Sequence, residues 1–180
     1  MSTTVSPCFS LKTTDPTIGH DFFQLVESNR SRLSKWFDWP NAVKSPQEAE
    51  RYLKKVKEAE SRFLRANFMI HSNGSIIGMA GLGHLDILNK KSDIYYWIDE
   101  KHEGQGIISS TCKHILHFGF SKMRLNRICI YCATDNARSI TVPERLGFTY
   151  EGTLRKAEKL NGNFNDLRLY SMLNEEWTSS

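Results

Sequence analysis

Apolar residues recur every three to four positions along the first third of the chain, which predicts helices there. One such run covers residues 22–33 and follows a short strand expected at 9–12. A second helix is expected over 46–63, because Ser45 and Glu48 form a capping box and a proline stands at the first helical position. Between these helices lies an aromatic cluster that ends at a proline, which disfavours helix at the residue before it.

Short apolar runs with turn residues between them follow from residue 66, which predicts strands. The clearest turn is Asn73-Gly74, since both central residues of a two-residue hairpin turn need positive φ. Helices are expected at 107–122 and, in a shorter form, after Asn136. The expected strands are residues 66–72, 75–83, 92–99, 127–133, 148–153 and 166–173, the last of them after an N-G-N turn at 161–163. Together these elements predict one mixed α/β (α+β) domain over residues 1–180.

Composition narrows the class of protein. Of the 180 residues, 39% are apolar and 24% are charged, as in ordinary folded domains. No run of 18 apolar residues exists, so a membrane span is not expected. The first residues lack the charged-then-apolar pattern of an export signal, so a cytoplasmic location is expected. The net charge of +4 suits a small polyanionic ligand but is weak support for nucleic-acid binding, which is not expected.

The four cysteines do not form a recognisable metal site. Cys129 and Cys132 make a C-x-x-C pair, but they stand in a strand-like run, where residues three apart point to opposite faces. Cys8 and Cys112 stand alone, so a structural zinc site lacks its second pair. No metal is therefore expected, and the cysteines are interpreted as small buried side chains.

The most informative segment is a glycine-containing loop between a strand and a helix. The strand is expected to end at Asp99, Gly104 and Gly106 follow, and an apolar helix begins at Ile107. Glycines let several backbone N–H groups point into one concavity, and a helix N-terminus adds partial positive charge, which suits a phosphate or pyrophosphate. The spacing fits neither a Walker motif nor a dinucleotide fingerprint. Alone, the loop is equally typical of a tight turn without a ligand.

Several segments together resemble the GNAT superfamily of N-acetyltransferases. The loop K-H-E-G-Q-G at 101–106 is similar to the family's acetyl-CoA motif, usually Arg/Gln-x-x-Gly-x-Gly/Ala, with lysine in place of the first residue. R-L-G-F-x-x-E-G-x-L at 145–154 resembles the RimJ/RimL subgroup, as do N-R-x-x-L-x-x-W-x-x-W at 29–39 and A-E-K-L-N-G at 157–162. The likeness extends over residues 11–177 and is nearest to the RimL-type ribosomal-protein serine acetyltransferases.

The resemblance implies a single GNAT-like domain with a central, mostly antiparallel sheet whose two middle strands splay apart, flanked by helices. It implies acetyl-CoA as acetyl donor, with the pantetheine arm in the gap and one strand N–H polarising the thioester carbonyl. Asn136 could contact that arm, cap its helix, or do both. The residues expected to bind the cofactor are Trp97, Ile98, Asp99, His102, Gly104, Gln105, Gly106, Ile107, Ile108, Ser109, Asn136 and Ser139.

Three residues are candidates for the chemistry. The resemblance puts the Ser139 hydroxyl near the cofactor sulfur, where it would donate a hydrogen bond to the leaving thiolate; an ordinary helix serine is the alternative. Glu158 is the candidate general base, since an α-amine of pKa about 8 needs only a modest pull on its proton. The alternative for Glu158 is a solvated strand charge. His84 is a second candidate base, or a polar residue of the cleft wall.

The acceptor side carries further candidates. Trp36 and Trp39 either line the acceptor groove or only pack the first two helices against the sheet. Tyr95 stands where related chains often have glycine, so its ring is expected to alter the acceptor cleft or a subunit contact. Pro143 cannot donate a hydrogen bond to the carbonyl of Ser139, so the helix after Asn136 is expected to bend beside the active site.

The function expected from the resemblance is transfer of an acetyl group from acetyl-CoA to a primary amine by direct attack in a ternary complex. The expected acceptor is a protein N-terminal α-amine of the ribosomal-protein serine type. The alternatives are a small amine or an aminoacyl or peptide antibiotic, in detoxification or self-immunity, and a non-catalytic CoA-binding sensor. A homodimer is a further expectation from the subgroup.

Overall fold

The computed structural model describes residues 9–178, so Cys8 lies outside the described residues. Seven strands form one sheet in the order β1-β2-β3-β4-β5-β7-β6. The strands are β1 (Phe9–Lys12), β2 (Ala66–Ser72), β3 (Ser75–Asp86), β4 (Lys91–Ile98), β5 (Arg127–Ala133), β6 (Thr149–Leu160) and β7 (Asn163–Leu173). The helices are α1 (Gly19–Leu33), α2 (Pro46–Ser61), α3 (Ile107–His117) and α4 (Ala137–Arg145). Short helical turns are η1 (Pro16–Ile18), η2 (Trp39–Ala42), η3 (Glu100–His102) and the π-helical η4 (Phe118–Lys122).

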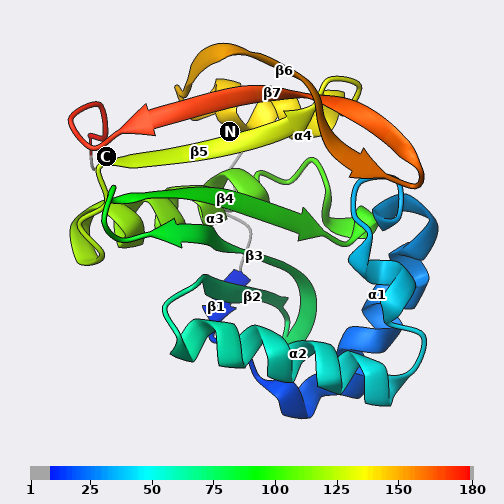
Figure 1. The fold of residues 1–180 in the computed structure, drawn as a ribbon. Helices are drawn as coiled ribbons and strands as arrows, with labels where there is room; N and C mark the ends of the chain where they lie inside the picture. Colours follow the sequence, from blue (N-terminus) through cyan, green and yellow to red (C-terminus); the bar gives the residue numbers. More distant parts are fainter. Residues whose placement is uncertain (1–8, 179–180) are drawn as a thin grey trace, which may run out of the picture.

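The middle of the sheet is splayed, as expected. Every neighbouring pair of strands is antiparallel except β4 and β5, which run parallel. Their ladder contains only the pairs Lys91 with Arg127, Ser92 with Ile128 and Asp93 with Cys129. Beyond Asp93 the two strands diverge toward the end of the sheet that faces α1 (Figure 1). The sheet therefore opens into a gap along most of β4.

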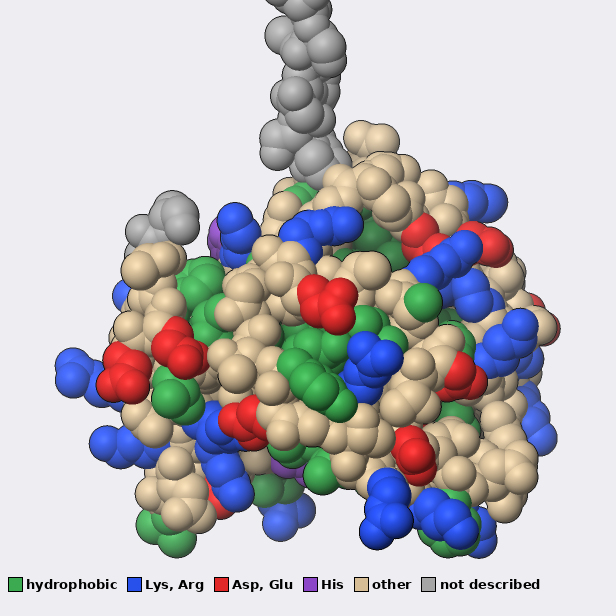
Figure 2. Space-filling model, turned by 90° about the horizontal axis from the view of Figure 1, so that it is seen from above, with side chains coloured by type: hydrophobic (Ala, Val, Ile, Leu, Met, Phe, Trp, Pro, Cys, Tyr) green, Lys and Arg blue, Asp and Glu red, His purple; other side chains and the backbone are tan. Residues whose placement is uncertain are grey.

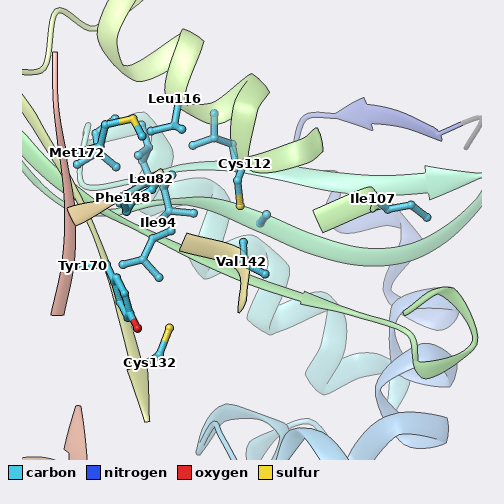
Figure 3. Close-up of a cluster of buried hydrophobic side chains, with 14 of the residues drawn as sticks. Leu82, Ile94, Ile107, Cys112, Leu116, Cys132, Val142, Phe148, Tyr170 and Met172 are labelled. Atoms are coloured by element: carbon cyan, nitrogen blue, oxygen red, sulfur yellow. The ribbon is translucent and has the colours of Figure 1, made fainter. Parts of the chain in front are cut away.

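Two hydrophobic clusters cover the two faces of the sheet. On one face, α3 and α4 pack over β3, β4, β5 and β7, with Ile115, Leu116, Ile128 and Tyr170 in the cluster. Figure 3 shows Cys112 and Leu116 pointing from α3 into this cluster, with Cys132 at its β5 end. On the other face, α1 and α2 cover only β2, β3 and β4. We call these faces the α3/α4 side and the α1/α2 side.

Local sequence signals account for most element boundaries. Asn73-Gly74 and Asn161-Gly162 adopt positive φ in all four residues, as their hairpin turns require. At the start of α2, the hydroxyl of Ser45 accepts a hydrogen bond from the Glu48 N–H, at 3.2 Å. The α-helix predicted over 107–122 ends at His117, and the chain continues as the π-helical turn η4. The strand expected from 148 is longer than predicted, since β6 extends to Leu160.

The C-x-x-C pair is buried and unpaired, as its strand context predicts. Cys112, Cys129 and Cys132 are free thiols. Cys132 belongs to the cluster on the α3/α4 side, and alternation along β5 turns Cys129 to the opposite face. Among residues 9–178, no three His, Cys, Asp or Glu side chains are grouped so that they could hold a metal ion. No helix of the described chain is long and apolar enough to span a membrane.

Strand β6 forms the exposed edge of the sheet beyond β7. Tyr150 and Leu154 of this strand are 51% and 41% exposed. Figure 2 views the molecule from above this edge, and basic and acidic side chains are interspersed there around an apolar patch. Charged side chains on an edge strand disfavour pairing with another chain.

Candidate functional site

A cleft opens where β4 and β5 separate. Its volume is about 170 Å³. It is lined by residues from the α1–α2 connection, from β4 to β7 and from the start of α4. These are Trp36, Phe37, Asp93, Ile94, Tyr95, Tyr96, Ile130, Tyr131, Cys132, Ala133, Asn136, Ser139, Glu158 and Leu167. Five of the residues expected at the site from the sequence therefore meet here: Trp36, Tyr95, Asn136, Ser139 and Glu158.

The cleft passes through the sheet from one face to the other. Side chains alternate along β4 and β5, so Tyr96 and Cys132 turn to the α3/α4 side while Asp93, Tyr95 and Tyr131 turn to the α1/α2 side. Ser139 therefore borders the cleft on the α3/α4 side, and Trp36 borders it on the other. The cleft is therefore bordered from both faces of the sheet.

Ser139 lies in the first turn of α4 and is held by three neighbours. Its N–H donates to the side-chain oxygen of Asn136, the N-cap of α4, at 3.2 Å. Its hydroxyl lies 3.1 Å from the Tyr96 Oη and 3.3 Å from the Cys132 Sγ. The helix-capping interpretation of Asn136 is therefore confirmed, and a contact with a ligand stays a prediction. The Ser139 hydroxyl faces the cleft with a fixed position.

Pro143 stands inside α4, as predicted, and its effect is local. Without an N–H, it leaves the Ser139 carbonyl without the usual helical donor four residues on. The Tyr96 hydroxyl donates to this carbonyl at 3.0 Å. Burial raises the pKa of Tyr96 well above its ordinary value, so the phenol keeps the proton that it donates. Tyr96 thus replaces the hydrogen bond that proline removes and ties α4 to β4.

Glu158 borders the cleft from β6. Burial, the largest cause, and the nearby charge of Asp38 raise the pKa of Glu158, while its hydrogen bond with Asn165 lowers it. A raised pKa makes a carboxylate a stronger base than an exposed glutamate. The turn between β6 and β7 is fastened to the α1–α2 connection, because the Asn161 side chain donates to the Ser34 carbonyl at 2.8 Å. This contact keeps Glu158 and Trp36 on the same cleft.

Two further acceptor candidates, Trp39 and Tyr95, differ in their surroundings, since Tyr95 lines the cleft and Trp39 does not. Trp39 is part of the α1/α2 cluster, with ring centroids 5.1 Å from Tyr52 and 5.6 Å from Trp97, and it does not line the cleft. Its packing interpretation therefore holds. The ring of Tyr95 packs over Gly81 and Gly83 of β3, where a larger residue would meet it.

His84 stands outside the cleft but touches a residue that lines it. Its side chain is 88% exposed, and its Nδ1 lies 2.9 Å from the Asp93 Oδ1.

The backbone of β4 is left open toward the gap. β4 pairs with β3 through residues such as Trp97, and the Asp99 N–H donates to the Ile77 carbonyl at 2.7 Å. Because alternate residues of an antiparallel strand turn their N–H and C=O groups to opposite sides, Tyr96 and Ile98 turn theirs toward β5. β5 no longer pairs with β4 there. Of the three strand residues expected to bind an extended arm, Ile98 faces the gap, although its carbonyl accepts from Arg32.

The glycine loop has the geometry of an anion site. Gly104 and Gly106 adopt φ of +74° and +76°, which favour glycine. Gly106 is the N-cap of α3 and supplies no side-chain cap, and the first helical hydrogen bond runs from the Ser110 N–H to the Gly106 carbonyl. The N–H groups of Ile107, Ile108 and Ser109 therefore have no helical partner. Their direction and the helix dipole suit a phosphate.

Side chains from two helices fix this loop. Glu103 accepts from Arg32 of α1 at 2.7 Å and also pairs with Arg138 of α4. Asn29 of α1 donates to the Asp99 carboxylate at 3.0 Å and accepts from the Glu100 N–H at 3.1 Å. The loop is thus held in place before any ligand arrives.

Sequence reasoning missed several cleft residues. The sequence places Tyr96 and Cys132 in expected strands without a role at the site, and only the packing of α4 on β4 brings them to Ser139. Alternation along β4 does put Tyr96 on the same face as its buried neighbours Ile94 and Ile98, so that signal was present. Asp93 carried no local signal, because its place depends on where the β4–β5 ladder ends.

Comparisons with known proteins agree with this geometry. Residues 13–149 match the family model described as an acetyltransferase (GNAT) domain. The ribosomal-protein-serine acetyltransferase of Escherichia coli (strain K12) is 34% identical over 151 residues, which is 84% of each chain. A solved structure of RimL, a ribosomal L7/L12 alpha-N-protein acetyltransferase in complex with coenzyme A, superposes with a TM-score of 0.88 at 29% identity, covering 96% of this chain and 97% of that one. The microcin C7 self-immunity acetyltransferase MccE, solved with acetyl-CoA and AMP, gives a TM-score of 0.86 at 25% identity, over 92% of each chain.

Proposed function

This chain belongs to the GNAT family of acetyltransferases, and we propose that it moves the acetyl group of acetyl-CoA to the N-terminal α-amine of a protein. One observation carries the proposal. A single cleft crosses the sheet, with a positioned hydroxyl on the α3/α4 side and a carboxylate of raised pKa beside it. Acetyl transfer to an amine is assisted by a base that takes the proton of the amine and by a donor that stabilises the leaving thiolate.

The described residues fit acetyl-CoA. The N–H groups of Ile107, Ile108 and Ser109, which have no helical partner, suit the pyrophosphate, with the Gly104–Gly106 loop and His102 beside them. Of the expected strand residues Trp97, Ile98 and Asp99, Ile98 turns its N–H to the gap in which the pantetheine arm would lie, and this N–H is the donor suited to polarise the thioester carbonyl. Gln105 supports the loop, since its side chain donates to the Lys101 carbonyl at 3.2 Å. No residue of this set calls for a metal.

Acetyl-CoA supplies a thioester whose carbonyl carbon forms the new C–N bond while its C–S bond breaks. Glu158 accepts the proton that leaves the acceptor nitrogen, directly or through one water. Because Tyr96 gives its one proton to the Ser139 carbonyl, the Ser139 hydroxyl is the donor in its contact with the Tyr96 Oη. As negative charge develops on the sulfur, this hydroxyl turns to donate to the sulfur instead, beside the Cys132 Sγ. Cys132 is not a nucleophile in this scheme, because burial raises the pKa of its thiol. The acetyl group therefore passes directly to the amine.

The identity of the acceptor is inferred from the related proteins and not from the fold, since proteins that share one fold act on different acceptors. Proteins named for acetylating ribosomal proteins match over most of this chain, which supports a protein N-terminus that begins with serine. That function requires a location where ribosomal proteins are made, and we propose the cytoplasm. We also propose a homodimer, which light scattering of the purified protein would test.

A second candidate function rests on the likeness to the self-immunity enzyme MccE. In that case the acceptor is a small aminoacyl or peptide compound.

Mass spectrometry of the products distinguishes a protein N-terminus from a small amine as the acceptor. Serine-starting peptides, the same peptides with a blocked α-amine, and a panel of small amines are incubated with acetyl-CoA and the protein. Acetylation at the α-amine of the open peptides alone supports the proposed function. Acetylation confined to small amines moves the function to detoxification or self-immunity. The absence of any product, with acetyl-CoA bound, favours a non-catalytic sensor.

A further inference from the structure

Asp93 lies at the closed end of the cleft. It forms the last pair of the β4–β5 ladder, opposite Cys129, and the gap begins directly after it. Its carboxylate turns to the α1/α2 side, the side from which Glu158 and Trp36 border the cleft, and only 16% of its side chain is exposed. Glu158 and Asp93 are the two carboxylates among the cleft-lining residues.

The surroundings of Asp93 leave it available to a ligand. Within the described chain, its one ion-pair partner is His84, whose Nδ1 lies 2.9 Å from Oδ1. The nearest strand cation on β5, Arg127, is engaged by both oxygens of Glu151, at 2.6 and 2.5 Å. The contact with His84 uses Oδ1, whereas Oδ2 lies beside Gly83 of β3, forms no ion pair within residues 9–178 and is left for a donor from the acceptor.

His84 is placed to orient this carboxylate. It sits in the irregular part of the β3–β4 ladder, between the pair formed by Gly83 and the pair formed by Asp86. Its φ is +46°, a value that non-glycine residues rarely adopt. A strained backbone persists where its surroundings hold it, and the contact with Asp93 is one such restraint.

We propose that Asp93 determines acceptor specificity by accepting a hydrogen bond from the first side chain of the acceptor, with His84 as its positioning residue. The inference rests on the proposed function and names a residue class for the acceptor. A half-buried carboxylate needs a donor, so it favours a hydroxyl next to the reacting amine and disfavours an acidic or purely aliphatic side chain. The aromatic walls, Trp36, Tyr95 and Tyr131, offer no competing charge.

The test compares two acceptors that differ only by this hydroxyl. Rates of thiol release from acetyl-CoA are measured with serinamide and alaninamide, and with a serine-starting and an alanine-starting peptide of otherwise equal sequence. The wild type is expected to prefer the serine form by at least tenfold in kcat/KM, since a site built around a hydroxyl rejects the analogue without it. Asp93→Ala is expected to abolish the preference through KM, and His84→Ala to reduce it.

Matched variants separate this effect from others. Asp86→Asn alters a partly exposed aspartate of the same hairpin that does not line the cleft, and it is expected to keep the full preference. Glu158→Gln is expected to lower the rates of both acceptors by the same factor. Asp93→Leu keeps the approximate shape of the side chain and cannot accept a hydrogen bond, so it serves if Asp93→Ala does not fold.

Each outcome has one meaning. A serine preference unchanged in both Asp93 variants overturns the inference and leaves the proposed function intact. Turnover of the amides but not of the peptides overturns the proposed protein acceptor, while the ratio between the amides still tests Asp93. A wild type that shows no preference for serine also overturns the inference.

Discussion

The hydrogen bond from Tyr96 to the Ser139 carbonyl allows a specific prediction. Tyr96→Phe removes the donor and leaves a half-buried carbonyl unpaired, because Pro143 offers no N–H. Such a loss costs about 1–3 kcal/mol of folding free energy. For a chain of this length, each kcal/mol lowers Tm by roughly 2–4 °C. The variant is expected to unfold roughly 2–12 °C below the wild type.

The cause is isolated by a second substitution. Pro143→Ala restores an N–H that can donate to the same carbonyl. In the Pro143→Ala background, Tyr96→Phe is therefore expected to cost less, with a coupling energy of about 1–2 kcal/mol between the two positions. Urea unfolding followed by circular dichroism measures all four proteins of this cycle. The comparison cancels the effect of proline on the unfolded chain.

Tyr95 is the matched control, because it is the adjacent residue and equally buried. Its hydroxyl is buried and has no hydrogen-bond partner. Tyr95→Phe is expected to be neutral or stabilising, since it removes an unsatisfied polar group. The reasoning is refuted if Tyr96→Phe costs the same in both backgrounds, or if Tyr95→Phe destabilises the protein as much.

Three further predictions concern the loop, the base and one ion pair. Gly106→Ala is expected to raise the KM for acetyl-CoA at least tenfold, because the φ of +76° at this position disfavours alanine. Gly74→Ala, at a φ of +83° in a distant hairpin, is equally strained and is expected to leave this KM unchanged, so equal effects of the two substitutions would contradict the phosphate-loop assignment. In a plot of kcat against pH, the fall on the acidic side is expected to begin at a higher pH than an ordinary glutamate would give, because the pKa of Glu158 is raised and its basic form is lost as pH falls. Glu158→Gln is expected to remove this fall, and a fall that survives the substitution would identify another base. The hydrogen bonds from Arg127, the largest cause, and from Ser171 lower the pKa of Glu151 to about 2, so this pair stabilises the fold above pH 4.5 and loses its contribution as pH falls from 4.5 through 2. Glu151→Gln is therefore expected to cost about 1 kcal/mol of folding free energy at pH 7 and little at pH 2, as measured by urea unfolding at both pH values; an equal cost at both would contradict this.

The fold could be predicted from local signals because each of them acts over a few residues. The hairpin turn at Asn73-Gly74 and the cap at Ser45 depend on their own side chains, and both are found as expected. The glycine loop could be predicted for the same reason: its two positive φ values and the helix after it are local. The ends of α3 and β6 were predicted less accurately, because tertiary packing and strand pairing determine where these elements end.

The site could be predicted only in part. Ser139, Asn136 and Glu158 were found through motifs, and the structure brings them to one cleft. Tyr96 was not found, because its role depends on the Ser139 carbonyl that Pro143 leaves unpaired, and only the fold brings this distant part of the chain to Tyr96. Trp39 has the same residue type and helical spacing as Trp36, yet only the structure separates a core ring from a cleft ring.

The central claim is that Ser139 and the cleft around it transfer acetyl groups from acetyl-CoA to an amine. Thiol release from acetyl-CoA with a serine-starting peptide tests it most directly, in the wild type and in Ser139→Ala, with acetyl-CoA affinity measured in parallel. We predict steady release by the wild type and a fall of at least tenfold in kcat for the variant, at unchanged affinity. Equal rates in the two proteins would contradict the role of Ser139, and no release with any acceptor, despite tight binding, would contradict the claim as a whole.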